Sequence, residues 1–138
     1  MGYSLGIGEN TRALVIARSL REMTKLGVAM GGRADTFPGL AGLGDLVVTC
    51  TSPHSRNRHV GEQIGAGKPI DEIIASMNQV PEGVKAASVI MEFASSYGIH
   101  MPIAREFDGV VNHQRTVEDA YRGLAAENPG HEVDCASF

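Results

Sequence analysis

Residues 42–58 read GLGDLVVTCTSPHSRNR, and residues 46–50 within them decide between an all-α fold and a mixed one. The composition of this short segment, LVVTC, is typical of a β-strand, because Val and Thr favour extended backbone. No partner strand is apparent elsewhere in the chain, however, and the segments on both sides have helical patterns. We therefore predict a helix here, and with it an all-α, multi-helix bundle.

Apolar periodicity and terminal signals predict the other helices. The first begins at a cap on Asn10 or Thr11 and stops at Gly27, with an apolar stripe on one side and Glu22 among the polar residues on the other sides. The second begins with Asp35 or Thr36 as its cap. Pro38 lies in the first turn of this helix, where proline is tolerated.

Five more helices follow, each ended by a turn that contains glycine, proline or polar residues. We expect them at about residues 55–66, 70–77, 84–97, 102–112 and 116–126. Ser55 and Thr116 are the expected caps of the first and last of these five helices. Residues 1–127 are thus predicted to form one helical domain, and residues 128–138 a polar C-terminal tail that frays.

The charge balance excludes a general nucleic-acid role. Sixteen Asp and Glu outnumber twelve Lys and Arg, which gives a net charge of −4. No secretory signal and no apolar run of about 18 residues is visible, so we expect a cytoplasmic protein without membrane insertion. Cys50 and Cys135 lie in dissimilar settings, and the five histidines lack metal-ligand spacing. We therefore predict no disulfide framework and no metal site.

Residues 45–57 carry the chemistry. The guanidinium of Arg56 offers a fixed fork of donors that suits phosphate, and Ser55 and Asn57 add neutral hydrogen-bonding groups. A carboxylate would repel phosphate, so Asp45 should serve another part of the ligand, such as a hydroxyl. This combination indicates a site for a small phosphorylated polyol. The plainer alternatives are a solvent-facing Asp45, or one ion-paired to Arg56, and a Ser55 that only caps a helix.

Gly6 and Gly8 do not begin a dinucleotide-binding fingerprint. The third glycine is absent, and no hydrophobic strand precedes the pair. We interpret these glycines as a flexible turn that leads into the first helix.

Several motifs in order resemble one family, the bacterial-type NAD(P)-dependent glycerol-3-phosphate dehydrogenases, in their C-terminal domain. The motifs are GENTRA at 8–13, RSLREM at 18–23, the FxGLAGLGDL pattern at 37–46, TCTS at 49–52, SRNR at 55–58 and EG at 82–83. The likeness extends to about residue 125. It implies a helical substrate domain similar to that of 6-phosphogluconate dehydrogenase. It also implies the interconversion of sn-glycerol 3-phosphate and dihydroxyacetone phosphate, which feeds glycerophospholipid biosynthesis.

The resemblance also implies roles for individual residues. Asp45 matches the family's substrate-binding aspartate beside the reacting hydroxyls, and Thr49 lies one helical turn later in the same catalytic network. Ser55, Arg56 and Asn57 match the substrate-binding triplet.

On the same basis, Val80 and Glu82 match positions that contact the cofactor, and Arg56 reaches the cofactor as well. The cofactor, NAD or NADP, would be held mainly by an N-terminal Rossmann domain that is absent here. The family's catalytic lysine also precedes this chain. We therefore expect the isolated chain to be inactive, to need the Rossmann domain as its partner, and to form a homo-oligomer.

Two other functions remain open at this stage. One is a non-catalytic helical module for oligomerisation or regulation. The other is the substrate domain of a related hydroxyacid dehydrogenase, although the Ser-Arg-Asn run favours a phosphate over a simple carboxylate.

Overall fold

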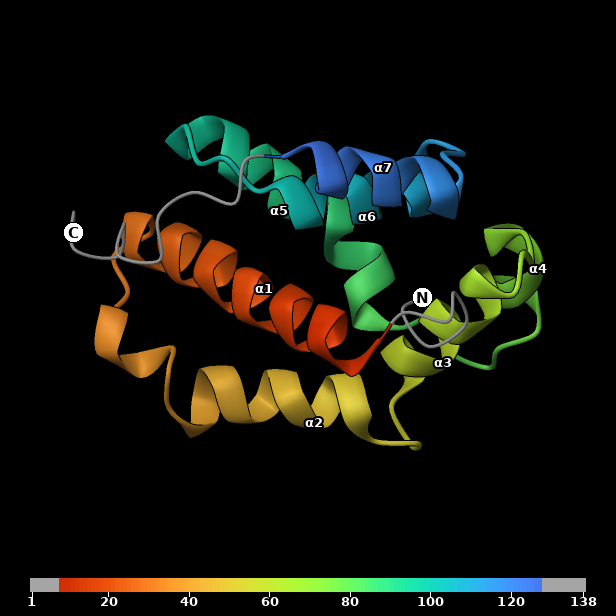
Figure 1. Ribbon diagram of the computed structural model, residues 1–138, viewed down its shortest axis with the longest axis horizontal. Coiled ribbons are helices and arrows are strands. Elements are labelled where there is room, and N and C mark those ends of the chain that lie inside the picture. The colour runs from red at the N-terminus through yellow and green to blue at the C-terminus, as the bar shows by residue number, and fades with distance from the viewer. Residues whose placement is uncertain (1–7, 128–138) are drawn as a thin grey trace.

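A computed structural model describes residues 8–127, and every regular element in this range is a helix (Figure 1). The α-helices are α1 (Glu9–Ala29), α2 (Asp45–Thr51), α3 (Arg56–Gly65), α4 (Ile70–Ala75), α5 (Glu82–Tyr97), α6 (Pro102–Asn112) and α7 (Val117–Ala126). A short 3-10 turn, Ala34–Thr36, and a π-helical segment, Leu40–Gly44, lie between α1 and α2. The predicted all-α fold is confirmed.

The segment with strand-like composition, residues 46–50, is helical and lies within α2. The Thr51 hydroxyl donates to the Val47 carbonyl at 2.8 Å, so this polar side chain is satisfied inside its own helix. With no strand between residues 8 and 127, extended backbone here would have no pairing partner. The context of the segment has overridden its composition.

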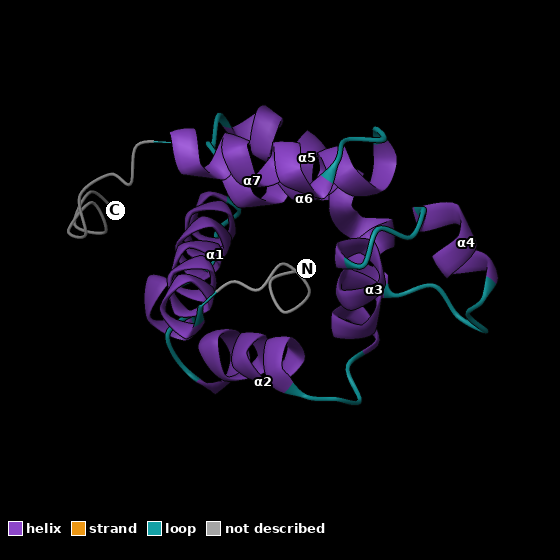
Figure 2. Ribbon diagram, turned by 45° about the vertical axis from the view of Figure 1, so that its right-hand side comes forward, coloured by secondary structure: helices purple, strands orange, loops and turns teal. Residues whose placement is uncertain are grey.

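The main hydrophobic core is formed by the five consecutive helices from α3 through α7. Among the described residues, its buried side chains come from these five helices: Val60, Ile64, Ile73, Val84, Ala87, Val110, Val111, Val117 and Ala120. A second, smaller cluster of Leu26, Ala94 and Met101 attaches α1 to α5 and to the start of α6. Helix α2 contributes no residue to either cluster and has no buried residue of its own. Figure 2 accordingly shows α2 at the side of the molecule opposite α5, α6 and α7.

The prediction that the first helix stops at Gly27 was wrong, as was its start at a cap on Asn10 or Thr11. Helix α1 begins at Glu9 after Gly8 and continues through Gly27 to Ala29. Gly27 serves a packing role instead, because a Cβ at this position would lie 2.1 Å from Cζ of Phe37. The ring of Phe37 thus packs directly on the α1 backbone. The helix ends near Gly31, whose φ of 96° is readily adopted only by glycine.

The second helix also begins later than predicted, at Asp45 rather than at Asp35 or Thr36. Pro38 therefore lies in a turn and not in the first turn of a helix. The chain first winds through the π-helical segment, in which Gly42 approaches the Phe37 carbonyl so closely that a Cβ would lie 2.0 Å from it. Phe37 is thus packed between Gly27 and Gly42, and it holds the start of α2 against the end of α1.

Glu22 was predicted on a polar side of the first helix, but it is buried, with 7% of its surface exposed. Its carboxylate accepts hydrogen bonds from the backbone N–H groups of Ile103, at 2.8 Å, and Ala104, at 3.1 Å. These groups belong to the first turn of α6, where N–H groups have no acceptor inside the helix. Burial raises the pKa of the Glu22 carboxyl, whereas the two backbone hydrogen bonds lower it to a lesser extent.

Glu106 of α6 is a second buried carboxylate, with 2% of its surface exposed, and its side chain lies against α7. Arg105 contacts it at 3.1 Å and Arg115 at 2.9 Å, so two guanidinium groups compensate one buried charge. Gly123 of α7 leaves the room for this carboxylate, because a Cβ there would lie 2.8 Å from Oε1. The α6–α7 pair is therefore joined by charge as well as by apolar packing.

The remaining helix predictions are confirmed within a few residues. Ser55 and Thr116 cap α3 and α7 through their side-chain oxygens, and Gly98 ends α5 with a φ of 65°. The predicted polar tail at 128–138, Cys135 and the glycine at position 6 lie outside the described residues.

Replacing Glu22 by Ala should lower the free energy of unfolding by about 1–3 kcal/mol, because two backbone donors of α6 lose their acceptor. Glu22→Gln keeps one acceptor oxygen and should lose less. Urea denaturation followed by circular dichroism measures both variants. Exposed Glu92 in α5 provides the control, and Glu92→Ala should change the value by less than about 0.5 kcal/mol.

The difference in stability between the wild type and Glu22→Gln should depend on pH with a definite sign. The raised pKa means that the folded chain holds the Glu22 proton more tightly than the unfolded chain does. The wild type should therefore lose stability relative to Glu22→Gln as the pH rises above the ordinary glutamate pKa of about 4.3. A difference that grows in favour of the wild type over this range would contradict the raised pKa.

Candidate functional site

A pocket of about 280 Å³ lies where α2, α3 and the start of α5 meet. This volume is just below the usual range for small-molecule sites, roughly 300–1,000 Å³. The lining residues come from three segments: Val48, Thr49, Ser52 and His54 from α2 and the loop after it, Ser55, Arg56 and Asn57 from the start of α3, and Pro81 and Glu82 from the start of α5. A small molecule fits this space, whereas a whole dinucleotide does not.

Ser55 begins the α3 side of the pocket. Its hydroxyl oxygen accepts a hydrogen bond from the Arg58 N–H at 3.2 Å, which is a normal N-cap. Arg56 and Asn57 then occupy the first two positions of α3, where backbone N–H groups have no acceptor inside the helix. This end of the ten-residue helix also carries the positive end of its dipole, so an anion is favoured here.

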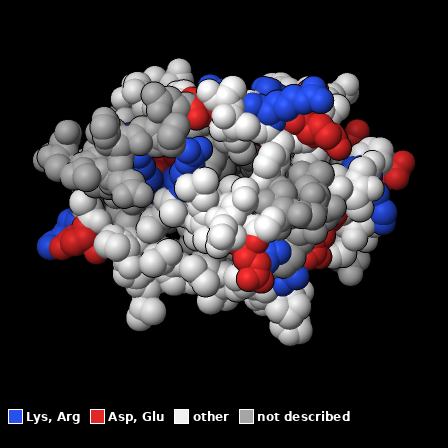
Figure 3. Space-filling model, viewed as in Figure 1, with Lys and Arg blue, Asp and Glu red and all other residues white. Residues whose placement is uncertain are grey.

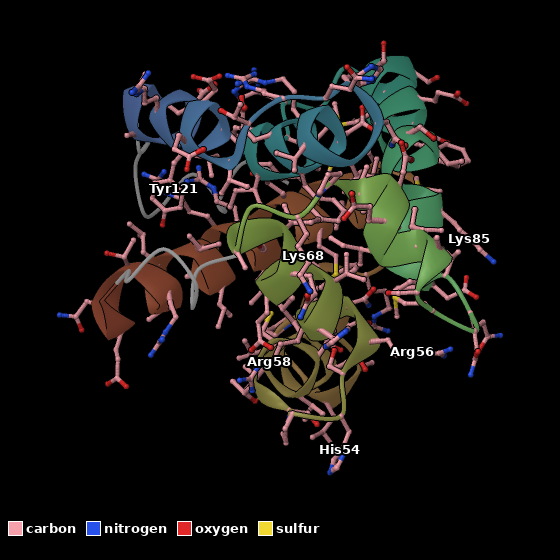
Figure 4. The ribbon with its side chains drawn as sticks, turned by 90° about the vertical axis from the view of Figure 1, so that its right-hand side faces the viewer. His54, Arg56, Arg58, Lys68, Lys85 and Tyr121 are labelled. Carbon is pink, nitrogen blue, oxygen red and sulfur yellow. The ribbon has the colours of Figure 1, made fainter. Side chains whose placement is uncertain are left out.

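The Arg56 side chain is exposed and donates from Nη1 to the side-chain oxygen of Gln79, in the loop before α5. Gln79 is neutral, so it orients the guanidinium without cancelling its charge. Figure 4 shows Arg56 and Arg58 on different sides of the first turn of α3, with His54 at the tip of the preceding loop. The charge of Arg56 is therefore available on the pocket side.

Asn57 lies against the first turn of α5. A Cβ on Gly83 would come within 2.9 Å of the Asn57 side-chain oxygen, so the two helix starts approach closely at this point. Pro81, just before α5, is among the most deeply buried side chains of the described residues. Because α3 and α5 both belong to the main core, the pocket wall that they form is firmly supported.

Five of the seven predicted site residues line this pocket: Thr49, Ser55, Arg56, Asn57 and Glu82. Asp45 does not line it, but it lies four residues before Thr49 in α2, which puts both on one side of that helix. Asp45 is exposed, and no ion pair within residues 8–127 joins it to Arg56. Val80 is half-buried and packs on the main core behind the pocket.

The other lining residues are Val48, Ser52, His54 and Pro81, and Gln79 lies nearby; none of these five was a predicted site residue. Val48, Ser52 and His54 lie within residues 42–58, which drew attention because of other residues in that segment. Pro81 could have been found from its place between Val80 and Glu82. Gln79 has no local signal, because its role depends on a contact with a residue 23 positions away.

Metal-binding side chains elsewhere in residues 8–127 form no competing site. On the face in Figure 3, Lys and Arg side chains lie next to Asp and Glu and leave broad uncharged areas. Within residues 8–127, no group of three or more His, Cys, Asp or Glu side chains is arranged to hold a metal ion. Burial raises the pKa of the Cys50 thiol, the free cysteine of α2. None of the helices in this range is both long and apolar enough to cross a bilayer.

Comparison with known proteins gives the context of this pocket. Residues 1–122 match the family described as NAD-dependent glycerol-3-phosphate dehydrogenase C-terminus. The chain belongs to this family. The pocket-lining residues all fall inside the matched range, so the site and the family assignment concern the same part of the chain.

Relatives at several distances carry the glycerol-3-phosphate dehydrogenase name with NAD(P)+ as its cofactor. A Mycobacterium avium protein is 82% identical over the whole of this chain, which covers 40% of that protein. A Sphingopyxis alaskensis protein is 57% identical over 96% of this chain, and one from Prosthecochloris aestuarii is 45% identical over 94%. This chain spans about 40% of the length of the glycerol-3-phosphate dehydrogenases that it matches.

Ser55→Ala should lower the free energy of unfolding by about 1 kcal/mol, because the first turn of α3 loses its cap. Thr116→Ala is the matched control, since Thr116 caps α7 through the Asp119 N–H at 3.1 Å and lies outside the pocket. Urea denaturation should give similar losses for the two variants. Ser55→Asp should recover most of the loss, and a silent Ser55→Ala would contradict the cap.

Proposed function

We propose that this chain is the substrate-binding domain of an NAD(P)-dependent glycerol-3-phosphate dehydrogenase. The observation that carries the proposal is the pocket itself. It combines an arginine, a serine and an asparagine at a helix N-terminus with a threonine on the facing helix. The matched family and the names of the relatives agree with this chemistry.

In this proposal the phosphate of glycerol 3-phosphate binds at the start of α3. Arg56 supplies the charge, Ser55 and Asn57 supply neutral hydrogen bonds, and the helix dipole adds to the attraction. The binding energy holds the rest of the small substrate in one orientation. The carbon chain then extends toward α2.

On α2, Thr49 and Asp45 would meet the hydroxyl end of the substrate. The exposed Asp45 carboxylate can accept a hydrogen bond from a hydroxyl, and its distance from the phosphate side avoids repulsion between the two anions. The proton that leaves the C2 hydroxyl is assigned by family resemblance to a lysine outside this chain. Asp45 and Thr49 would hold the hydroxyl where that transfer takes place.

The nicotinamide cofactor would supply hydride transfer to and from C2 of the substrate. The pocket of about 280 Å³ fits at most one end of such a cofactor. Arg56 and Glu82 are exposed side chains at this pocket and would contact that end, while Val80 supports the same loop from the core side. The larger part of NAD or NADP would lie on the domain that this chain does not contain.

A preceding Rossmann domain is the partner that this proposal requires. Several apolar side chains of α1, the π-helical segment and α2 are exposed, and contact with a second domain would bury them: Leu14, Leu40, Val47 and Val48. A homo-oligomer and a cytoplasmic location belong to the same proposal.

A full-length chimera tests the function. This chain would replace the matching 40% of the Mycobacterium avium relative, to which it is 82% identical. With dihydroxyacetone phosphate and reduced cofactor, the chimera should oxidise the cofactor, as followed by nicotinamide absorbance. The 138-residue chain alone should give no turnover, since it lacks both the catalytic lysine and most of the cofactor site. An inactive but folded chimera would contradict the proposal, as would turnover by the chain alone.

Arg56→Ala in the chimera should raise KM for glycerol 3-phosphate by about ten- to a hundredfold, the equivalent of one lost charged hydrogen bond. Arg56→Lys should lie between, because an ammonium keeps the charge but not the fork. The control is Arg33→Ala, which removes an exposed arginine that pairs with Asp35 far from the pocket. Steady-state kinetics with unchanged KM in Arg56→Ala would remove Arg56 from the phosphate site.

A further inference from the structure

Arg58 contacts two different parts of the molecule from its place in the first turn of α3. Its Nε donates to Oε1 of Glu62, one turn later in the same helix, at 2.8 Å. Its Nη1 donates to the backbone carbonyl of Thr51, the last residue of α2. The Arg58 side chain is 22% exposed; its contact with Glu62 is partly buried, and its contact with the Thr51 carbonyl is exposed.

Helix α2 depends on such contacts because the core does not hold it. It has no buried residue, and two of its apolar side chains, Val47 and Val48, are 39% and 62% exposed. Residues 52–55 connect it to α3 along the chain, and it also packs against α3, α1 and the π-helical segment. The last carbonyls of a helix receive no hydrogen bond from an N–H group of the same helix, so the Thr51 carbonyl can accept one from Arg58.

The two helices that Arg58 joins form two of the three sides of the pocket, and the start of α5 forms the third. Thr49 and Val48 line it from α2, and Ser55, Arg56 and Asn57 line it from α3. The α3 side is fixed by the main core, in which Val60 and Ile64 are buried. The separation of the two sides is therefore set by how the end of α2 is fastened to α3.

We propose that Arg58 is a positioning residue: by fastening the end of α2 to the start of α3, it sets the spacing between the hydroxyl side and the phosphate side of the pocket. This inference rests on the proposed function. It means that Arg58, which does not line the pocket, determines the length of substrate that the pocket accepts. A ligand that spans both sides is recognised through this spacing, whereas a ligand confined to the α3 side is not.

An arginine suits this task better than a lysine. The guanidinium is planar and rigid and carries several donors, so one group can bond Glu62 and the Thr51 carbonyl at the same time. Glu62, four residues later on the same helix, fixes the direction of the fork. An ammonium at this position keeps the charge but cannot hold both acceptors in that fixed geometry.

Two ligands of the chimera separate positioning from a general effect. Inorganic phosphate needs only the α3 side, whereas glycerol 3-phosphate spans both sides. Arg58→Ala should lower kcat/KM for glycerol 3-phosphate about tenfold, since a small misplacement of reacting groups has effects of this size or larger. The association constant of inorganic phosphate as a competitive inhibitor, 1/Ki, should fall by a clearly smaller factor, because this ligand feels only the lost charge.

The ratio of kcat/KM to 1/Ki removes the effect of the lost charge, because both ligands carry the phosphate and feel that loss alike. Arg122→Ala is the matched control: it removes an exposed arginine of α7, and both constants should stay at their wild-type values. Arg58→Lys keeps the charge and should give a ratio between those of the wild type and Arg58→Ala. If Arg58→Ala does not fold, the Lys variant decides the question.

A wild-type ratio in both Arg58 variants, with the two constants unchanged or weakened equally, would overturn the positioning role. Arg56→Ala distinguishes this result from a failure of the proposed function. If Arg56→Ala weakens both ligands while the Arg58 variants keep the wild-type ratio, only the positioning role is wrong. If Arg56→Ala weakens neither ligand, the phosphate site itself is wrong.

Discussion

The carboxylate of Glu22, bound to two backbone N–H groups of α6, is the link on which the position of α1 depends. Its partners lie 81 and 82 residues further along the chain, and a small apolar cluster around Leu26 assists it. Through the ring of Phe37, packed on Gly27, the placement of α1 carries over to the segment that leads into α2. A buried, desolvated carboxylate at one side of the molecule thus helps to place a wall of the pocket at the other.

The pocket is built from parts of unequal rigidity. The starts of α3 and α5 rest on the main core and approach each other at Asn57 and Gly83, and they hold the groups that suit an anion. Helix α2 lies outside that core and brings Thr49 to the opposite side. This division suits a substrate with one charged end and one reacting end, because the charged end can bind to a frame fixed by the core while the other end meets α2, whose position depends on contacts outside the core.

Local signals were sufficient for most of the fold. Caps such as Ser55 and stops such as Gly98 act within one turn, so they can be read without knowledge of the tertiary structure. The candidate pocket was found largely because Ser55, Arg56 and Asn57 are adjacent in the sequence. The burial of Glu22 and the contact of Gln79 with Arg56 were missed, since each depends on a partner in another element. Gly27 looked like a helix stop for the same reason: its partner, Phe37, lies beyond the helix.

The composition of the main core has a consequence for the order of folding. All nine of its buried residues fall between positions 60 and 120, and they come from consecutive helices joined by short turns. Contacts between neighbours in sequence form with little loss of loop entropy, so this part can assemble quickly. Docking of α1 closes a loop of about eighty residues and so costs more loop entropy than the contacts between neighbouring helices, although this cost grows only slowly with length. We therefore expect α1 to dock after the main core has formed. A ribosome that releases this chain from its N-terminus therefore exposes α1 well before the helices that bury Glu22 have emerged.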